Sequence, residues 1–386
     1  MNGKTGAGPI TILHLCEHFG GAESTLHGVS RAFQWWIPNF DRSRFRVLLC
    51  SRKGPDKAAA EMERSGLHPL YLGGGKMDPR NLTRLLRLLR KEKVDIIHAH
   101  GFGACMWGRI AGLIMHLPVI VHARCNYHTV PLMMRPVERI LGPRTKYAFA
   151  VSESTRRYTI IKRHVPESAV RVLYNGILLN NIKRVSGEWI QTFREEHGAG
   201  PDTSIVGIVG RVVSHKGHID AFKAVRSLRQ IMPDTKLWVL GDGDYLPVLR
   251  KWLDENNCAE MVRFFGFRKD VLDIIQCFDA QIFPSRFEGT PNTLFEAMAV
   301  GNCIVAAPTD GQGEILRDNH TALMFELGNP HDMAAKLKVA LADKRFSSKL
   351  RAHALEASKQ FDGMKCIKTM EELYGKIMAA GHSGSA

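Results

Sequence analysis

Two carboxylates on either side of a loop of small and polar residues are the groups in this sequence best suited to chemistry. Glu288 and Glu296 flank the run GTPNT at residues 289–293, which follows an apolar strand and precedes an apolar helix from Leu294 to Val300. A loop between a strand and a helix start presents backbone N–H groups to an anion. Ionised glutamate only accepts hydrogen bonds and can bind two neighbouring hydroxyls. The pattern predicts a site for phosphate and sugar hydroxyls together, as a nucleotide-sugar requires.

Paired glutamates at this spacing are also common on solvated helices, so a second loop is needed to support the interpretation. Arg211 and Lys216 follow an apolar strand at residues 205–209 and lie between Gly210 and Gly217. Charge builds on a diphosphate as it leaves a sugar, and fixed cations nearby would stabilise that transition state. A metal ion could do the same, but no Asp-x-Asp cluster occurs in a suitable loop. The sequence therefore predicts a metal-independent reaction without a cofactor, the alternative being a pair of surface cations.

Loops in the first half of the chain carry further candidates. Gly20 and Gly21, in the run HFGGAES at residues 18–24, allow close approach of a ligand to the backbone, although a paired glycine is often only a tight turn. His98 and His100 form a His-x-His pattern that could indicate zinc. No third ligand follows at a suitable spacing, and histidines at strand ends are more often packed. We expect no metal site here.

The alternation of apolar strands and helices predicts the fold class. At 386 residues the chain is long enough for two domains, and we place them at residues 1–183 and 184–365. Strands alternating with helices in both halves imply two parallel, doubly wound sheets of the α/β class. In such sheets ligands bind beyond the carboxyl ends of the strands. The expected strands are 11–16, 46–50, 96–98, 118–122, 147–151 and 170–173 in the first half, and 205–209, 237–240, 262–264, 280–283 and 303–306 in the second.

Charge is concentrated in the first half of the chain. Residues 1–185 hold 29 Lys and Arg against 12 Asp and Glu, a net +17, whereas the remainder holds 24 against 26, a net −2. This asymmetry predicts an anionic partner: a nucleic acid, a membrane surface or an anionic acceptor. No helix-turn-helix, RNA-recognition or zinc-finger pattern is present, so no nucleic-acid partner is expected.

The compartment follows from the cysteines and the apolar runs. The eight cysteines show no Cys-x-x-Cys spacing, which favours buried thiols in a reducing cytoplasm. No signal peptide is visible, and the longest apolar run, residues 110–121, is too short for a membrane span. We expect a cytoplasmic protein.

Taken together, these motifs resemble those of the GT-B glycosyltransferases, in particular the retaining family 4 (glycosyl transferases group 1). The stretch from Glu288 to Glu296 resembles the family's E-x7-E motif, Gly210 to Gly217 resembles G-R-x4-K-G, and GGAE at 20–23 matches its first loop. The resemblance implies two Rossmann-like domains facing across a deep cleft. An N-terminal domain would bind the acceptor and a C-terminal domain the donor, and a final helix at about 366–386 would cross back to the first.

The resemblance also implies roles for single residues. Arg211 and Lys216 would hold the donor diphosphate, Glu296 the ribose and Glu288 the hexose. Either His122 or Arg124 would approach the donor sugar, and the sequence leaves the choice open. The remaining residues implied to bind the donor are Gly20, Gly21, Gly210, Gly241, Phe267, Gly289, Thr290, Asn292, Thr293 and Leu294.

We therefore expect a retaining glycosyltransferase that moves a hexose or N-acetylhexosamine from a UDP- or GDP-linked donor to a glycan acceptor. A lipid-linked acceptor of polysaccharide, O-antigen or lipopolysaccharide biosynthesis fits the basic half. Apolar and basic residues mix in Thr129–Lys146 and Arg156–His164, and Trp35 and Trp36 add a candidate interfacial anchor. These segments predict peripheral docking on the inner face of the cytoplasmic membrane.

Three other protein classes remain as alternatives. A sugar-nucleotide epimerase shares the GT-B fold and is the nearest enzymatic rival. A nucleic-acid-binding α/β protein would explain the basic half. A dinucleotide-dependent oxidoreductase would explain the sheets, but no G-x-G-x-x-G follows the first strand.

Overall fold

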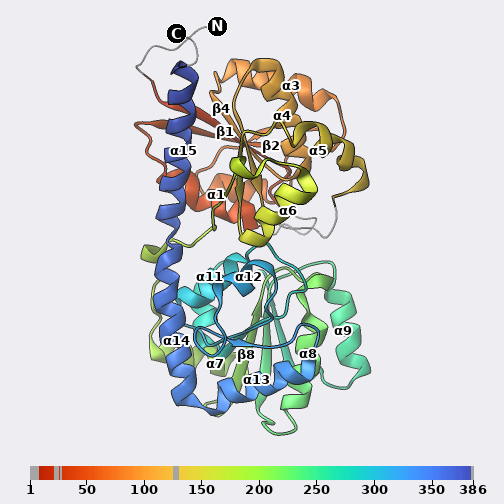
Figure 1. Cartoon of the computed structure of the whole chain (residues 1–386). Helices are drawn as coiled ribbons and strands as arrows, with labels where there is room; N and C mark the ends of the chain where they lie inside the picture. The colour runs from red at the N-terminus through yellow and green to blue at the C-terminus, as the bar shows by residue number, and fades with distance from the viewer. Residues whose placement is uncertain (1–7, 21–25, 27, 125–129, 384–386) are drawn as a thin grey trace. The chain divides into compact units, whose positions relative to one another are not determined.

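The structure is a computed structural model that describes residues 8–20, 26, 28–124 and 130–383, with side chains to residue 380. The chain divides into two compact units (Figure 1). The first consists of Met1–Asn175 together with Met364–Ala386, and the second of Gly176–Gly363. Each unit is built around its own sheet.

The first unit contains a seven-stranded sheet with the strand order β3-β2-β1-β4-β5-β6-β7, in which all neighbours pair in parallel. The strands are β1 Ile10–Cys16, β2 Phe45–Ser51, β3 Leu70–Tyr71, β4 Ile96–His100, β5 Val119–Ala123, β6 Tyr147–Ala150 and β7 Val170–Val172. The helices are α1 Gly28–Asn39, α2 Ala59–Arg64, α3 Arg80–Lys91, α4 Phe102–Met115, α5 Arg135–Leu141, α6 Glu153–Arg163 and α15 Gly363–Ser383.

Side chains alternate between the two faces of this sheet and build a core on each. In β1, Ile12 and Cys16 pack with Phe33 of α1 and Met370 of α15, whereas Leu13 packs with side chains of α3 and α4 on the other face. Successive residues of a strand point to opposite faces, which explains why β1 is apolar at nearly every position. Helix α15, the last of the chain, is therefore an integral layer of the first unit (Figure 1).

The second unit contains a six-stranded parallel sheet with the order β10-β9-β8-β11-β12-β13. The strands are β8 Ser204–Val209, β9 Thr235–Leu240, β10 Val262–Gly266, β11 Ala280–Phe283, β12 Ile304–Ala306 and β13 Leu323–Met324. The helices are α7 Gly187–Glu196, α8 His218–Leu228, α9 Leu246–Glu255, α10 Val271–Ile274, α11 Asn292–Ala299, α12 Asp310–Ile315, α13 Pro330–Ala342 and α14 Lys344–Ser358. Val206 and Ile208 pack under α8 and α13, and Ile205 packs under α7 on the other face.

The predicted α/β class with two parallel sheets is confirmed, and each expected strand is present to within two residues at either end. The sequence missed β3 and β13, edge strands of two residues each, which are too short to show an apolar pattern. Residues 176–183, for which the sequence predicts a place in the first domain, group with the second unit. Ile177 accounts for this grouping, because it exchanges backbone hydrogen bonds with Phe361 and Gly363.

None of the helices in the described part of the chain combines the length and the apolar character that crossing a membrane demands.

Candidate functional site

The loop after β8 brings the two predicted cations to the carboxyl edge of the second sheet. The chain leaves β8 through Gly210, whose φ of 149° is unfavourable for other residues, and enters a 3-10 turn at Ser214–Lys216. Gly217, with φ 75°, then begins α8, and a Cβ there would lie 2.3 Å from the carbonyl oxygen of Pro284. Glycine is thus required at Gly217 by both its conformation and its neighbour. Arg211 is exposed, and Lys216 is half-buried.

Lys216 and Glu288, which lie far apart in the sequence, meet in the folded unit. The Lys216 ammonium donates a hydrogen bond to Glu288 Oε1, and each side chain retains 16% of its surface exposed. Ser285 Oγ lies 3.4 Å from the same carboxylate oxygen. A small cavity lined by Gly210, Lys216 and Ser285, among others, separates the loops after β8 and β11. The structure therefore places a cation and a carboxylate together where these two loops converge.

A neighbouring loop fixes the backbone around Glu288. Asp310 Oδ2 accepts a hydrogen bond of 2.8 Å from the backbone N–H of Glu288, and Thr309 Oγ1 donates to the carbonyl of Ser285. A Cβ at Gly311 would lie 1.9 Å from the carbonyl oxygen of Gly289, so α12 packs directly on the loop. Asp310 could not be recognised along the sequence, because its contact with Glu288 depends on the position of β12 beside β11.

The residues between the two glutamates form a short loop and then the start of α11, which begins at Asn292. Gly289, Thr290 and Leu294 are buried, whereas Asn292 and Thr293 are half-buried in the first turn of the helix. Glu296 lies further along α11 and is 7% exposed. The two glutamates differ accordingly: Glu288 is a loop residue paired with a lysine, and Glu296 belongs to the buried face of a helix. Backbone N–H groups of the first turn lie between them.

Gly241 and Phe267 follow the next two strands of the same sheet. Gly241 N donates to the Gly266 carbonyl, and a Cβ at Gly241 would lie 1.8 Å from the Gly210 carbonyl oxygen. The loops after β8, β9 and β10 are thus in direct backbone contact. Phe267 is 39% exposed at the end of β10. An exposed aromatic ring beside these loops suits stacking against a planar base.

His218, at the start of α8, is a residue the sequence did not single out. It is buried and lines the same cavity as Lys216. Burial, and then the charge of Lys216, lower the pKa of His218 to about 4, so the ring is neutral at neutral pH. Neither ring nitrogen has a hydrogen-bond partner among the described residues.

In the first unit, the loop after β1 is held by two carboxylates. Asp56 Oδ2 accepts from the backbone N–H groups of Phe19 and Gly20, at 3.1 and 3.0 Å. Gly21 lies outside the described residues. Glu17 accepts from the backbone N–H groups of Gly103 and Ala104 and so occupies the N-terminus of α4. That helix start is satisfied by the chain's own carboxylate and does not need an external anion.

His122 and Arg124, the two candidates for the residue after β5, have different environments. His122 lies inside β5, is 1% exposed and stacks against Trp36. Arg124 is half-buried just beyond the strand end, with its guanidinium carbon 4.4 Å above the Trp36 ring. Trp36 is fully buried, which contradicts its suggested role as an interfacial anchor.

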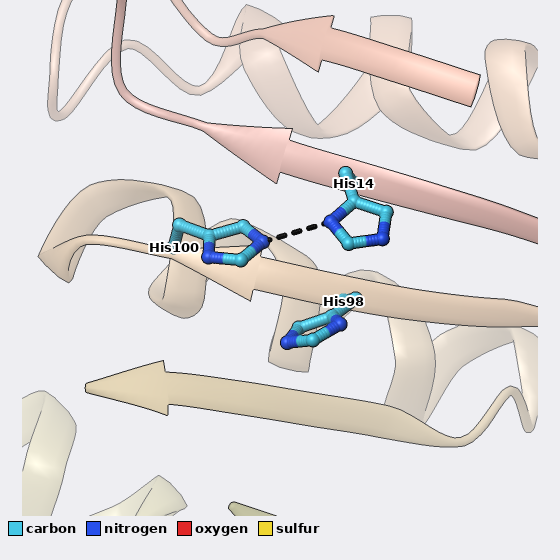
Figure 2. A group of neighbouring side chains, drawn as sticks. All are labelled: His14, His98 and His100. Atoms are coloured by element: carbon cyan, nitrogen blue, oxygen red, sulfur yellow. Dashed lines mark hydrogen bonds between the residues drawn. The ribbon is translucent and has the colours of Figure 1, made fainter. Parts of the chain in front are cut away.

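The His-x-His pattern of β4 gains a third histidine from β1. Nitrogen atoms of His14, His98 and His100 lie within 4.8 Å of one another, and all three rings are buried (Figure 2). Sequence spacing could not reveal His14, because β1 and β4 are adjacent only in the sheet.

Two family models match the chain, one over each half. The model described as Glycosyltransferase Family 4 matches residues 19–180, and the model described as Glycosyl transferases group 1 matches residues 190–361. Together they cover most of the chain and span both sheets.

Named relatives and solved structures agree with these matches. An Escherichia coli UDP-Gal:alpha-D-GlcNAc-diphosphoundecaprenol alpha-1,3-galactosyltransferase is 21% identical over 308 residues, which are 77% of this chain and 79% of the relative. A Campylobacter jejuni N-acetylgalactosamine-N,N'-diacetylbacillosaminyl-diphospho-undecaprenol 4-alpha-N-acetylgalactosaminyltransferase is 25% identical over 269 residues, 69% of this chain and 70% of the relative. The crystal structure of Anabaena Alr3699/HepE in complex with UDP superposes with a TM-score of 0.82 at 20% identity, covering 95% of this chain and 100% of that one.

The fold and the matches define the class of this protein. Two doubly wound parallel sheets of this topology give the chain the GT-B fold, and both family models that match it describe glycosyltransferases. Within that class, the chain belongs to the group 1 glycosyl transferases. The family predicted from its motifs is thereby confirmed.

Proposed function

We propose that the protein is a retaining glycosyltransferase that moves a hexose or N-acetylhexosamine from a nucleotide-sugar to a lipid-linked glycan. The observation that carries this proposal is the convergence of Lys216, Glu288 and the first turn of α11 at one carboxyl edge. A cation and helix N–H groups suit a diphosphate, and the adjoining carboxylate suits sugar hydroxyls. Retention of the anomeric configuration is part of the proposal because the motifs of this chain resemble those of the retaining family 4.

The contact between Lys216 and Glu288 gives the site a way to respond to its donor. In the structure, the lysine and the carboxylate form an ion pair. A bound diphosphate would compete for Lys216, and a hexose hydroxyl would then satisfy Glu288. Arg211, which is exposed and forms no ion pair in the described part of the chain, adds a second cation. Both charges would stabilise the negative charge that develops on the leaving diphosphate.

We propose a uridine diphosphate donor, with Phe267 and Gly241 near the base and Glu296 near the ribose. The relative in Escherichia coli is named for UDP-Gal, and the Anabaena structure contains UDP. Thermal-shift measurements with UDP- and GDP-linked sugars test this choice. Stabilisation by GDP-sugars alone would contradict the assignment of the base.

The proposed acceptor is a glycan carried on a polyprenyl diphosphate. Both named relatives act on diphosphoundecaprenol-linked sugars. In the first unit, the segment from residue 130 to Lys146 exposes Leu132, Met133 and Ile140, and residues 156–164 expose Ile161. Basic side chains are exposed beside them at Arg135, Arg139, Arg144, Lys146, Arg157 and Lys162. Apolar side chains next to cations suit an anionic membrane surface.

The experiment that tests the function is transfer of a radiolabelled sugar to a polyprenyl-diphosphate oligosaccharide. Product should form only when donor and acceptor are both present, and the anomeric configuration of the donor should be retained. A sugar-nucleotide epimerase would instead convert the donor without any acceptor. Acceptor-independent release of a modified sugar would therefore overturn the proposal.

We further propose that transfer is independent of metal, since Arg211 and Lys216 supply the charge that a metal would otherwise provide. Activity should persist in excess EDTA. Loss of activity that magnesium or manganese restores would contradict this part of the proposal.

A further inference from the structure

Four histidines and a tyrosine form one continuous hydrogen-bonded group in the core of the first unit. His14 of β1, His98 and His100 of β4 and His122 of β5 all lie on the face covered by α1 and α15. Each ring is at most 2% exposed. Tyr374 of α15 is fully buried among them. The proposed donor-binding loops do not account for this group.

A metal site is the first interpretation to test, since three of the rings lie close together (Figure 2). The contact between Arg124 and His100 argues against a metal site. Arg124 Nε and Nη2 lie 3.4 and 3.3 Å from His100 Nδ1. A guanidinium has donors and no acceptor, so His100 Nδ1 must offer its lone pair to Arg124. Neutral His100 then carries its proton on Nε2, the nitrogen that faces His14, and has no lone pair left for a metal.

The proton position on His100 determines which atom donates and which accepts in each of the next hydrogen bonds, from His100 to His14 and from His14 to Tyr374. His100 Nε2 lies 3.0 Å from His14 Nδ1, which must accept. His14 then carries its proton on Nε2, which lies 3.2 Å from Tyr374 Oη. Each neutral imidazole has one N–H and one lone pair, so a proton fixed on one ring fixes the next. The assignment needs neutral rings, and burial lowers the pKa of His14 to about 3 and that of the other three well below its ordinary value.

The tyrosine turns the sequence of hydrogen bonds back into the sheet. Tyr374 Oη accepts from His14 and therefore donates to His98 Nδ1, at 2.6 Å. His98 Nε2 then donates to His122 Nδ1, at 3.1 Å. The proton of His122 is left on Nε2, and this atom is buried without a hydrogen-bond partner in the described structure. The unsatisfied donor of this group thus lies at the opposite end of the hydrogen-bond series from Arg124. A series in which every ring donates away from Arg124 must end in such a donor.

This direction stabilises a positive charge at Arg124. Each ring accepts a hydrogen bond on the side that leads back to Arg124 and carries its N–H on the other side, so each hydrogen bond polarises its neighbour in the series. Burial lowers the pKa of Arg124 to about 9, which leaves it charged at neutral pH. Its other partners among the described residues are neutral: Asn175 Oδ1 accepts a hydrogen bond from Nη1, and the Trp36 ring lies 4.4 Å from the guanidinium carbon. No described carboxylate forms an ion pair with Arg124, so its charge is available to a ligand.

We propose that Arg124 binds an oxyanion at the carboxyl edge of the first sheet, and that His100, His14, Tyr374, His98 and His122 are positioning residues for it. The ligand is a phosphate or diphosphate group, which suits a guanidinium held in a fixed plane. Its identity as a substrate phosphate rests on the proposed function, whereas the hydrogen-bond order does not. Two sources fit: the donor diphosphate and the diphosphate of a lipid carrier.

The hydrogen-bond order is tested by 15N NMR of the full-length protein labelled at histidine. All four rings should carry the proton on Nε2 and remain neutral from pH 8 to pH 5, and added zinc should leave their signals unchanged. A proton on Nδ1 of any of the four rings, titration of a ring near pH 6.5, or a zinc-dependent shift of its signal would overturn the proposed hydrogen-bond order.

The positioning role is tested with Tyr374→Phe, because only a hydroxyl can accept from His14 and also donate to His98. Tyr71→Phe is the matched control in the same unit, since the Tyr71 hydroxyl is buried and bonds to no described group. Tyr374→Phe should give mixed tautomers at His98 and His122 and weaken inorganic pyrophosphate binding, followed at the His100 Nδ1 signal, by about tenfold. Tyr71→Phe should do neither. Equal behaviour of the two variants would overturn the proposal.

The anion and its source are tested with Arg124→Gln. The His100 signal should no longer respond to pyrophosphate in this variant; a response equal to that of the natural protein would overturn the oxyanion site. In transfer assays, a raised KM for the nucleotide-sugar identifies the donor diphosphate, and a raised KM for the acceptor identifies the lipid carrier. Unchanged values for both would overturn the substrate role. Failure of the transferase proposal would leave the NMR results intact, so the two outcomes are distinguishable.

Discussion

At the scale of single residues, the ion pair between Lys216 and Glu288 shapes the chemistry of the second unit. It joins the two motifs that the sequence offered separately, one after β8 and one after β11. Each partner is partly exposed, so the pair is screened by solvent and is a weak source of stability. It holds a cation and a carboxylate together where the loops after β8 and β11 converge, and we propose that both exchange partners with the donor.

We predict that Lys216→Ala lowers turnover by roughly 10²-fold or more, the loss expected when a group that stabilises transition-state charge is removed. The rate of transfer at saturating donor measures this. Lys223→Ala is the control, because Lys223 is an exposed lysine on α8 of the same unit. Transfer at a near-normal rate by Lys216→Ala would show that the diphosphate is held elsewhere.

At the scale of elements, the proposed donor loop between Glu288 and Glu296 owes its shape to its neighbours. Helix α12 contacts it backbone to backbone at Gly311, and Asp310 holds the N–H of Glu288. In the first unit, α15 supplies the hydroxyl that links two histidines. In both cases an element distant in sequence fixes the geometry of a loop or strand.

We predict that Gly311→Ala destabilises the protein by about 1–3 kcal/mol, because its Cβ would lie 1.9 Å from the Gly289 carbonyl oxygen and would force the loop to move. Urea denaturation measures the change, and donor affinity should fall with it. Gly187→Ala is the matched control, since nothing lies within 4 Å of a Cβ there. Equal stability of the two variants would contradict the tight packing of α12 on the loop.

At the scale of the whole molecule, charge and buried histidines set the response to solution conditions. The net +17 of residues 1–185 makes the first half of the chain the part that attracts anions. The same half buries four neutral histidines, whose protonation would place charge in an apolar core. Salt concentration and pH should therefore act mainly through the first unit.

Stability should fall as the pH drops below about 6.5. The pKa of His14 is about 3 in the folded protein, and those of His98, His100 and His122 are also well below their ordinary value, whereas unfolded histidine titrates near 6.5. The unfolded chain thus binds protons first, and each histidine removes about 1.4 kcal/mol of stability per pH unit below that value. Urea denaturation at pH 7, 6 and 5 measures the slope. A free energy of unfolding that does not change over this range would contradict neutral burial.

Docking of the protein on anionic vesicles should depend on the apolar and basic surface of the first unit. Leu132→Asp should abolish flotation with anionic liposomes at low salt, because Leu132 is 74% exposed among basic side chains. Ile231→Asp is the control, since Ile231 is 63% exposed in the second unit. Binding should also weaken as salt shortens the Debye length below about 8 Å. Equal loss in both variants, or binding insensitive to salt, would contradict this surface.

The sequence by itself determined the fold class and the family, and it supplied most of the residues that we propose for the donor loops. Strand and helix periods are local properties, and Arg211, Lys216, Glu288 and Glu296 lie in short motifs that can be recognised along the chain. Only the tertiary structure decided which of these groups meet. Lys216 reaches Glu288, and Arg124 is linked to Tyr374, because parallel sheets bring the ends of distant strands together and α15 returns to the first sheet. The proton positions of His14, His98, His100 and His122 follow from those contacts, since each ring's free nitrogen is set by its neighbour in space rather than in sequence.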